Sequence, residues 1–345
     1  MKCQGCLLEK EFAVTEVLGG ITVGFCKKCL KELFDNKKVS PVLPFNSPYT
    51  EGTNLYTDLT QKMSISGGQV KYSMKLEKSS VVFTDKGGQY ILKPIPSGQF
   101  KNLDQAPANE HLTMQIAKQF FKISVPANAL VYFRDGSAAY LVRRFDVRAD
   151  ARQPDGQGSK FQQEDFAQIA QVTAEIHGKN YKYDLSYEEI GNLITKHIVT
   201  HPIEKEKFFR LVLFNFIFSN GDAHVKNFSA IKTVTGDYVL TPAYDLLCTT
   251  LHTPNEADMA LTLFTEDFSD AYNAYGFYTH YDFLLFGKKL DIKESRIVKI
   301  INQFRAANGS IAEMIDRSFL RDDLKELYAK LLNENKKRLN IEWKQ

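Results

Sequence analysis

The sequence has little net charge and no long apolar run. Lys and Arg number 44 against 41 Asp and Glu, which leaves a formal net charge of +3. This charge is too small to indicate nucleic acid or an acidic membrane as the main partner. The most apolar stretch, residues 208–218, is about half as long as a membrane span and contains Arg210 and Asn215. At the N-terminus, no long apolar run follows the first basic residue, which argues against a secretory signal, so we expect a cytoplasmic protein.

Cysteine is also scarce, but it is concentrated near the N-terminus. Four of the five cysteines lie within the first 29 residues, at Cys3, Cys6, Cys26 and Cys29. Two C-x-x-C pairs with 19 residues between them match the spacing of a four-thiolate zinc site, whereas disulfides would suit a secreted chain. We therefore predict a structural Zn²⁺ here, and the alternative is four reduced thiols in a small packed module. The fifth, Cys248, follows two leucines and is predicted to be a buried small hydrophobe.

The order of the expected elements divides the chain into four parts. The 43% of hydrophobic residues supports a sizeable core, and 345 residues favour two domains with a small third module. Short runs rich in β-branched and aromatic residues alternate with turns in the first half, and apolar residues recur at helical spacing in the second. The sequence thus predicts the α+β class. The parts are a cysteine module at 1–35, a proline-rich linker at 36–62, a β-rich lobe at 63–146 and a helical lobe at 147–345.

Individual elements follow from the same patterns. We expect strands at 72–76, 81–84, 89–92, 129–133 and 139–145, and a helix after Pro107. In the second half we expect helices at 166–173, 190–198 and 204–218, a hairpin at 228–241, and charged amphipathic helices from 293 to 337. The helix at 204–218 is apolar on nearly every face and should be the buried centre of its lobe.

Three features of the β-rich lobe are weak signals when each is considered alone. Ser64-Ile-Ser66-Gly67-Gly68-Gln69 is a glycine-rich turn whose backbone N–H groups are able to bind phosphate, although paired glycines usually mark only a turn. Lys93 ends a strand, where lysines are usually solvated. Glu110 lies near the start of a helix, where the helix dipole alone explains an acidic residue.

The segment from Asn220 to Asn227 is a stronger signal. It follows the buried helix and contains Asp222, His224, Lys226 and Asn227 within eight residues. A loop that only caps a helix seldom needs an acid, an imidazole, an ammonium and an amide together. Asp222 and Asn227 are five positions apart, as are the base and the metal ligand in the H-R-D-x-x-x-x-N loop of protein kinases. Asp245 follows the hairpin, where a carboxylate is able to hold Mg²⁺ together with Asn227.

The order of these five features is that of a protein kinase. A glycine-rich turn, a strand lysine, a helix glutamate, an acid-to-amide loop and a second aspartate follow one another, and the two lobes match as well. Phosphoryl transfer needs positioned cations and a carboxylate beside the attacking hydroxyl rather than covalent chemistry by the protein. We therefore predict a two-lobed protein-kinase-like fold.

The chain resembles the HipA-type serine/threonine kinases of bacterial toxin–antitoxin systems. The stretches that carry the resemblance are 64–71, 90–94, 109–110, 141–146, 220–227 and 243–246, and the Asp-x-His-x-Lys-Asn loop is its most specific part. The resemblance covers nearly all of the chain after the linker. It implies an ATP-dependent, Mg²⁺-dependent transfer of the γ-phosphoryl group to a protein hydroxyl.

Roles for single residues come from this resemblance. It implies that Asp222 is the catalytic base, supported by His224 and Lys226, and that Asn227 and Asp245 bind Mg²⁺. Further ATP-binding positions are implied at Ser64, Ser66, Gly67, Gly68, Gln69, Lys93, Glu110, Arg143 and Phe145. The family often has Glu where Arg143 stands, so at Arg143 the backbone rather than the side chain is expected to meet adenine.

The resemblance also implies regulation and partners. Ser64 and Ser66 lie on the segment that family members autophosphorylate, and the alternative is that both are ordinary turn residues. Full-length members begin with a further domain of about a hundred residues, in whose place this chain has the cysteine module and linker. We therefore expect a separately encoded small subunit and a helix-turn-helix antitoxin as partners, with DNA contacted only through the antitoxin. Relatives modify aminoacyl-tRNA synthetases, which makes such an enzyme a candidate substrate.

Two alternatives remain open at this point. Aminoglycoside and choline kinases share the lobe order and an acidic loop, so the acceptor of the phosphoryl group is either a protein or a small molecule. A non-catalytic, zinc-anchored module that binds an antitoxin is the other alternative. The residues that the chemistry needs are all present, namely Asp222, Asn227, Asp245 and Lys93. Their presence favours an enzyme over a non-catalytic module.

Overall fold

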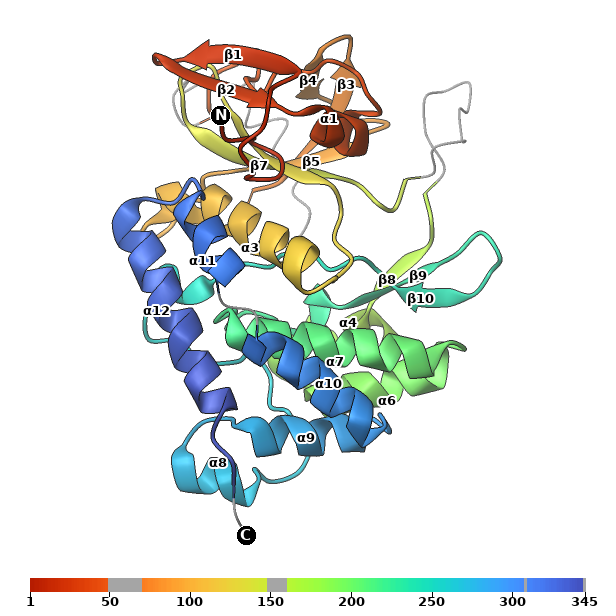
Figure 1. Cartoon of the computed structure of the whole chain (residues 1–345). Helices are drawn as coiled ribbons and strands as arrows, with labels where there is room; N and C mark the ends of the chain where they lie inside the picture. Colours follow the sequence, from red (N-terminus) through yellow and green to blue (C-terminus); the bar gives the residue numbers. More distant parts are fainter. Residues whose placement is uncertain (49–69, 148–159, 307–308, 344–345) are drawn as a thin grey trace. The chain divides into compact units, whose positions relative to one another are not determined.

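A computed structural model describes residues 1–48, 70–147, 160–306 and 309–343 (Figure 1). The chain divides into two compact units. The first, called the β unit here, comprises residues 1–115, 126–160 and 313–325, and the second, the helical unit, comprises 116–125, 161–312 and 326–345. The predicted glycine-rich turn at 64–69 and most of the predicted linker lie outside the described residues.

The β unit is built on a five-stranded antiparallel sheet in the order β4-β3-β5-β7-β6. The strands are β3 (Tyr72–Glu77), β4 (Ser80–Phe83), β5 (Tyr90–Pro94), β6 (Asn128–Tyr132) and β7 (Ala138–Arg143). All five predicted strands are therefore confirmed, with ends shifted by one or two residues. α3 (Ala106–Phe120) follows β5, and its residues up to Gln115 belong to the β unit.

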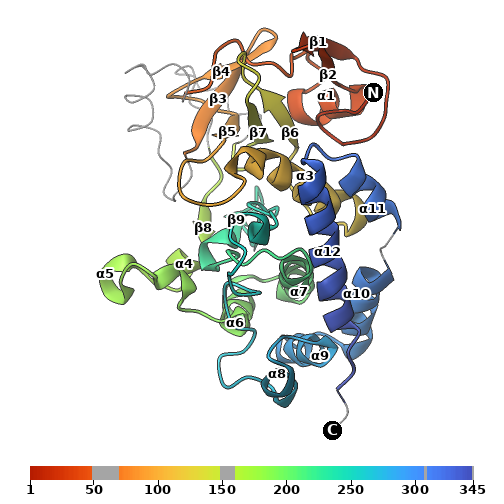
Figure 2. The same cartoon turned by 90° about the vertical axis from the view of Figure 1, so that its left-hand side faces the viewer.

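The cysteine module packs on this sheet. It contains a hairpin of β1 (Val14–Leu18) and β2 (Ile21–Phe25) and the helix α1 (Lys27–Phe34), which lie beside the β6 end of the sheet in Figure 2. Gly19 and Gly20 both have positive φ and form the hairpin turn. The buried side chains of the module and of strands β3 to β7 form one hydrophobic cluster. The module thus shares its core with the sheet, which supplies the apolar contacts that the short segment lacks.

The start of the predicted linker is ordered against β6. Leu43 N–H donates to Tyr132 O, and Tyr132 N–H donates to Pro41 O. Val39 and Leu43 are buried. The prolines at 41 and 44 do break regular structure, but the residues between them still pair with the edge strand because the edge of a sheet has backbone groups to satisfy.

The helical unit is centred on α7 (His201–Ile217), whose phenylalanines at 208, 209, 214 and 216 are fully buried. α6 (Tyr187–His197) and α10 (Glu294–Ala306) pack against it, and α9 (His280–Lys289) packs against α10. The remaining helices are α4 (Phe166–Ile169), α5 (Ala174–His177), α8 (Asp270–Tyr275), α11 (Gly309–Asp316) and α12 (Asp322–Leu339). The residues of α11 and of α12 are each divided between the two units. A small sheet has the order β10-β9-β8, formed by Tyr238–Leu240, Ser229–Lys232 and Gln163–Asp165.

One predicted helix is much shorter than expected. The apolar spacing at 166–173 predicts an amphipathic helix, but α4 ends after one turn. Gln171 has a φ of 58°, a left-handed conformation that cannot continue a right-handed helix.

Among the described residues, no helix is both long enough and apolar enough to cross a membrane.

Candidate active site and cysteine cluster

The acid-to-amide loop follows directly from the end of α7. Asn220 holds this loop to the segment of Asp245. Its Nδ2 donates to Asn215 Oδ1 at 3.1 Å and to Asp245 O at 3.3 Å, and its Oδ1 accepts from Asp222 N–H at 3.3 Å. One buried amide therefore joins α7, the loop and the second aspartate. The sequence signal for this role is only that Asn220 opens the motif.

The C-terminal end of α7 is closed by Asn335 of α12. Asn335 Nδ2 donates to Phe216 O at 2.9 Å, to Ile217 O at 3.4 Å and to Ser219 Oγ at 2.9 Å. The last carbonyls of a helix have no partner inside the helix, so a buried side-chain donor is needed to satisfy them. Asn335 thus fixes the point from which the loop starts, and nothing in its local sequence indicates this.

We expect Asn335→Leu to lower the free energy of unfolding by about 1–3 kcal/mol, because the buried carbonyls at the end of α7 lose the donor that Asn335 supplies. Urea unfolding with an unchanged m-value measures this effect. Asn333→Leu is the matched control, since Asn333 is exposed on the same helix and its replacement should change stability by less than about 0.5 kcal/mol. Equal stabilities of the two variants would contradict the capping role.

Asp222 is accessible and receives a hydrogen bond from a tyrosine. Its side chain is 51% exposed. Tyr183 Oη donates to Asp222 Oδ1 at 2.6 Å, and Lys182 Nζ lies 3.6 Å from the same oxygen. Burial and the negative charge of Asp222 raise the pKa of Tyr183, so the hydroxyl stays protonated and remains a donor. Tyr183 is not predictable from the local sequence, because it lies 39 positions before Asp222.

Asn227 and Asp245 have properties that suit metal ligands. Asn227 Oδ1 is buried and has no hydrogen-bond partner among the described residues. Asp245 has a φ of 54°, an uncommon conformation for a residue with a side chain and one that is frequent at functional sites. Amide and carboxylate oxygens are the donors that Mg²⁺ prefers. The residues present therefore fit a magnesium ion.

His224 and Lys226 are tied to the framework around the loop. Burial lowers the pKa of His224 to about 4, in spite of the nearby charge of Asp222, so the imidazole is neutral at pH 7. Lys226 Nζ donates to Tyr181 Oη at 3.1 Å, and Lys226 O accepts from Tyr244 Oη at 2.8 Å. These contacts position the loop rather than leaving the two side chains in solvent.

Lys93 and Glu110 form a buried ion pair in the β unit. Lys93 Nζ lies 2.5 Å from Glu110 Oε1, and each side chain is about 5% exposed. Lys93 comes from β5 and Glu110 from the second turn of α3. From the sequence alone, a solvated lysine is the simplest interpretation of Lys93. The burial of both side chains excludes that interpretation. The ring of Tyr140 on β7 lies 5.5 Å from Lys93 Nζ and covers the pair.

The side chain of Arg143 is directed to the cysteine module. Its guanidinium donates to both carboxylate oxygens of Asp35, at 2.7 and 2.8 Å, and to Glu32 O at 3.2 Å. This two-point contact between the end of β7 and the end of α1 gives the Arg143 side chain a role in holding the module. Phe145 lies two residues further on and is partly buried.

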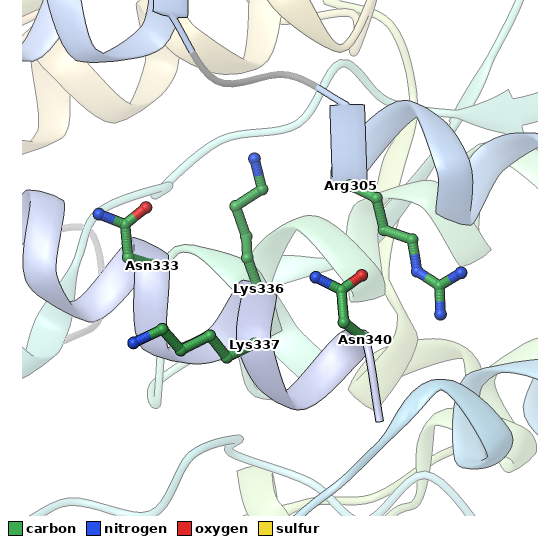
Figure 3. Close-up of a pocket in the computed structure, with 5 residues that line it drawn as sticks. All are labelled: Arg305, Asn333, Lys336, Lys337 and Asn340. Atoms are coloured by element: carbon green, nitrogen blue, oxygen red, sulfur yellow. The ribbon is translucent and has the colours of Figure 1, made fainter. Parts of the chain in front are cut away.

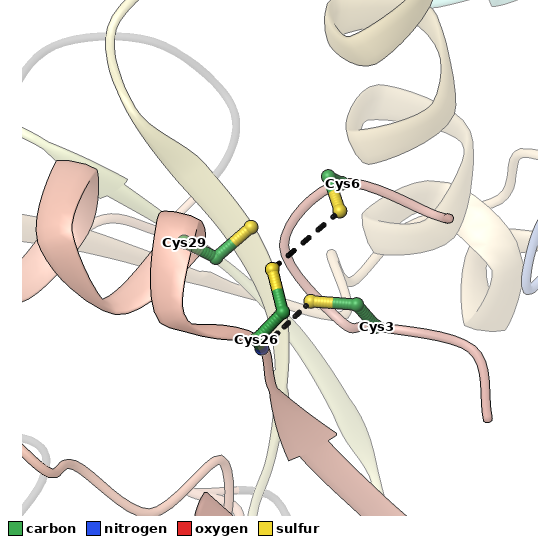
Figure 4. A group of neighbouring side chains, drawn as sticks. All are labelled: Cys3, Cys6, Cys26 and Cys29. Atoms are coloured by element: carbon green, nitrogen blue, oxygen red, sulfur yellow. Dashed lines mark hydrogen bonds between the residues drawn. The ribbon is translucent and has the colours of Figure 1, made fainter. Parts of the chain in front are cut away.

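The four N-terminal cysteines gather at one point (Figure 4). Their sulfur atoms all lie within 4.8 Å of one another, and all four residues are buried. Hydrogen bonding to Cys3 and Cys6, together with burial, raises the pKa of Cys29, so four thiolates would not coexist here without a cation. The cluster is able to bind a metal ion. Cys248 is buried elsewhere, as predicted, and burial raises its pKa to about 12.

A basic hollow of about 300 Å³ lies on the helical unit (Figure 3). It is lined by Arg305, Asn333, Lys336, Lys337 and Asn340. Of the described residues that were predicted for catalysis or ATP binding, none lines it. Arg305 donates to Leu339 O at 2.7 Å, so its guanidinium also satisfies the last carbonyl of α12.

The structure therefore brings the predicted residues together in three sets. Asp222, His224, Lys226 and Asn227 share one loop that Asn220 ties to Asp245 in the helical unit. Lys93 and Glu110 pair in the β unit, and the four cysteines form the cluster. The described residues do not include the predicted phosphate-binding positions Ser64, Ser66, Gly67, Gly68 and Gln69.

Comparison with known proteins defines the class. The two-lobed, protein-kinase-like fold with a β-rich N-lobe and a helical C-lobe is confirmed. A solved complex of HipA, HipB and operator DNA from Shewanella oneidensis contains a chain that matches 80% of this one with a TM-score of 0.61 and 22% identity. The family model of the HipA-like C-terminal domain matches residues 63–311. The chain belongs to this family.

Individual relatives agree with this assignment. A Haemophilus influenzae protein named "Putative kinase" is 29% identical over 310 residues, which cover 86% of this chain and 87% of the relative. A Sinorhizobium fredii protein, "Putative kinase Y4dM", is 32% identical over 217 residues, but these are 48% of its length. This chain likewise spans 65% of the matched Shewanella chain. The chain thus spans most of the length of the Haemophilus protein, but only about half to two thirds of the length of the Sinorhizobium and Shewanella proteins.

Proposed function

We propose that the protein is an ATP-dependent serine/threonine protein kinase that transfers the γ-phosphoryl group of ATP to a protein hydroxyl. The observation that carries this proposal is that Asp222 and Asn227 share one loop in the helical unit, which Asn220 joins to the segment of Asp245. Family membership and the buried Lys93–Glu110 pair add support. Transfer of a phosphoryl group depends on positioning and on charge stabilisation, and each requirement has a residue here.

In this proposal, each residue has a defined task. Asp222 accepts the proton of the attacking hydroxyl, and Asn227 and Asp245 hold Mg²⁺, which would neutralise charge on the phosphates. Lys93 binds the phosphates and is oriented by Glu110. The backbone at Arg143 to Phe145 contacts adenine. Neutral His224 and Lys226 keep the loop in place.

The exposure of Asp222 favours a protein acceptor over a small molecule. A carboxylate that is 51% exposed is accessible to a hydroxyl on the surface of a macromolecule, whereas kinases of small metabolites bury their acceptor in a pocket. Incubation with γ-labelled ATP and either proteins or aminoglycosides and choline tests this. Label on serine or threonine of a protein supports the proposal. Label confined to the small molecules would favour the alternative, and no label at all would favour a non-catalytic module.

Tyr183 is expected to compete with the acceptor for Asp222. Its hydroxyl lies 2.6 Å from Asp222 Oδ1, where an attacking hydroxyl would have to donate its proton. We expect Tyr183→Phe to lower the KM for the protein acceptor about threefold to tenfold, because one neutral hydrogen bond no longer has to be displaced. Tyr275→Phe, at an exposed tyrosine, is the control. An unchanged or higher KM would show that Tyr183 does not occupy the acceptor position.

We also propose autophosphorylation of Ser64 or Ser66 as a brake. A phosphate there adds about −1.5 to −2 charges in the segment that is expected to contact the nucleotide phosphates, and the repulsion should weaken ATP binding. Titration of the phosphorylated and unphosphorylated proteins with ATP measures the effect. Equal affinities would exclude the brake.

Partners and setting follow from the same family. The matched Shewanella HipA chain is described in complex with HipB and its operator DNA, which supports a helix-turn-helix antitoxin as a partner and DNA contact through it. We further propose a separately encoded small N-terminal-subunit-like protein, a cytoplasmic location and a toxin role. An aminoacyl-tRNA synthetase is the candidate substrate. Phosphoproteomics after induction of the wild type and of Asp222→Asn identifies the substrate, and purification with native operon neighbours tests the partners.

A further inference from the structure

The cysteine cluster has the geometry of a tetrahedral thiolate site. Zinc–sulfur bonds of about 2.3 Å place tetrahedral sulfur atoms about 3.8 Å apart. The Cys6 and Cys26 sulfur atoms are 4.0 Å apart, and all four lie within 4.8 Å. Small adjustments of side-chain torsions therefore suffice to bind an ion.

The backbone around the cluster is also arranged for a bound metal. The N–H of Cys26 donates to Cys3 Sγ at 3.3 Å, which stabilises negative charge on that sulfur. Gly5 lies between the first two cysteines, and a Cβ there would lie 2.6 Å from Cys29 Sγ. The loop Cys3–Cys6, called the first knuckle here, thus passes so close to Cys29 that only glycine fits.

The first knuckle contacts the helix that carries Glu110. His111 Nε2 lies 3.1 Å from Gly5 O, and His111 is completely buried. A carbonyl oxygen only accepts, so Nε2 of His111 carries the proton and donates it. The ring of His111 is stacked at 6.2 Å on Phe319, and Lys2 Nζ donates to Ser318 O at 3.0 Å. The knuckle and α3 are therefore joined through one buried polar contact, and residues 318 and 319 contact both α3 and the residue that precedes the knuckle.

The start of α3 is consequently held from two directions. Glu110 is bound by Lys93 of β5, and the next residue, His111, is bound by the knuckle. The knuckle itself is fixed to the sheet, because Leu130 N–H donates to Gln4 O at 3.0 Å. Loss of the knuckle conformation would leave the Nε2–H of His111 buried without its acceptor, and a shift of α3 would relieve this.

We propose that the four cysteines bind one Zn²⁺ and that the zinc-loaded knuckle holds α3 where Glu110 contacts Lys93. Zinc is the expected ion because four thiolates in a tetrahedron select it over harder cations. Binding releases the thiol protons and involves no change of oxidation state. The consequence for ATP binding rests on the proposed function, whereas the metal site and its effect on α3 do not.

The metal is tested on the purified full-length protein by elemental analysis. We expect about one Zn²⁺ per chain, lost in Cys26→Ser and retained in Cys248→Ser, the matched control at a buried cysteine outside the cluster. After chelation under denaturing conditions, all five cysteines should react as thiols. A zinc-free protein that does not take up Zn²⁺, or a disulfide within the cluster, would overturn the proposal.

The coupling to α3 is tested through His111. Gln is able to replace the Nε2–H donor, and Leu is not, so His111→Gln should behave as the wild type and His111→Leu should not, although both retain zinc. In His111→Leu and in the zinc-stripped wild type we expect faster hydrogen exchange of amides at 108–115 and an ATP affinity lower by about 5- to 150-fold.

The two readouts separate two kinds of failure. Faster exchange without any ATP binding, even by the zinc-loaded wild type, would sink the proposed kinase function and keep the zinc-to-helix coupling. Unchanged exchange in both zinc-stripped protein and His111→Leu would overturn the coupling, whatever the ATP affinity.

Discussion

Asp222→Asn is expected to lower kcat for phosphoryl transfer about 10²- to 10⁴-fold, which is the usual contribution of a general base. The amide has the same shape but cannot take the proton of the attacking hydroxyl. Its oxygen still accepts the hydrogen bond from Tyr183, which lies 2.6 Å from Asp222, so the fold and the affinity for ATP should be unchanged. A single-turnover assay with γ-labelled ATP separates this chemical step from binding.

A matched control is available in the same unit. Asp237, in the exposed turn between β9 and β10, receives its hydrogen bond from Thr235 and has no role in the proposed chemistry. Asp237→Asn should transfer phosphate at the wild-type rate. If Asp222→Asn transfers within threefold of wild type, another residue is the base.

Lys93→Met is expected to abolish detectable transfer and also to destabilise the protein. The Glu110 carboxylate is about 5% exposed and would lose a partner at 2.5 Å. Breaking a buried ion pair from one side costs about 3–5 kcal/mol, because a charge is left buried without its counterion. Chemical denaturation measures the stability, and the assay with γ-labelled ATP measures the transfer.

A double variant separates the two effects. Lys93→Met combined with Glu110→Leu replaces both charges by apolar groups of similar size, which is often neutral for stability. We expect stability to recover to within about 1–2 kcal/mol of the wild type and transfer to remain lost, because the phosphates still lack their cation. An active double variant would make the pair purely structural.

The sequence predicts the β-sheet well for a physical reason. In β3 the side chains of Tyr72 and Met74 are buried while Ser73 between them is partly exposed, and this alternation is visible in the sequence. The glycine turns that separate the strands are visible as well. The cysteine spacing likewise predicts the cluster, because thiol ligands are few and their separation reflects one knuckle geometry.

The supporting contacts were not predictable in the same way. Asn335 reaches the end of α7 from 118 residues away in sequence, and Tyr183 reaches Asp222 from 39 away. Such contacts depend on how helices pack, which no local pattern records. The short helix α4 was missed for a related reason, since apolar spacing indicates a buried face but not where the backbone turns left-handed, as it does at Gln171.

Arg143 illustrates what the structure adds. The sequence indicates only that Arg stands where the family often has Glu. The structure shows its guanidinium on Asp35 of the cysteine module, so this side chain holds the module to the end of β7. The Arg143 side chain therefore joins β7 to the end of α1, and the contact of its backbone with adenine stays a prediction.

Titration with ATP in the presence and absence of Mg²⁺ tests the central claim most directly, namely that the protein binds ATP with Mg²⁺ and needs Lys93 and Asp245 to do so. Lys93→Met/Glu110→Leu should weaken binding under both conditions, because the ammonium contacts the phosphates. Asp245→Asn should weaken binding only when Mg²⁺ is present, because its carboxylate acts through the ion. Wild-type affinity of either variant in Mg²⁺ would show that the replaced residues take no part in nucleotide binding, and the account would be wrong.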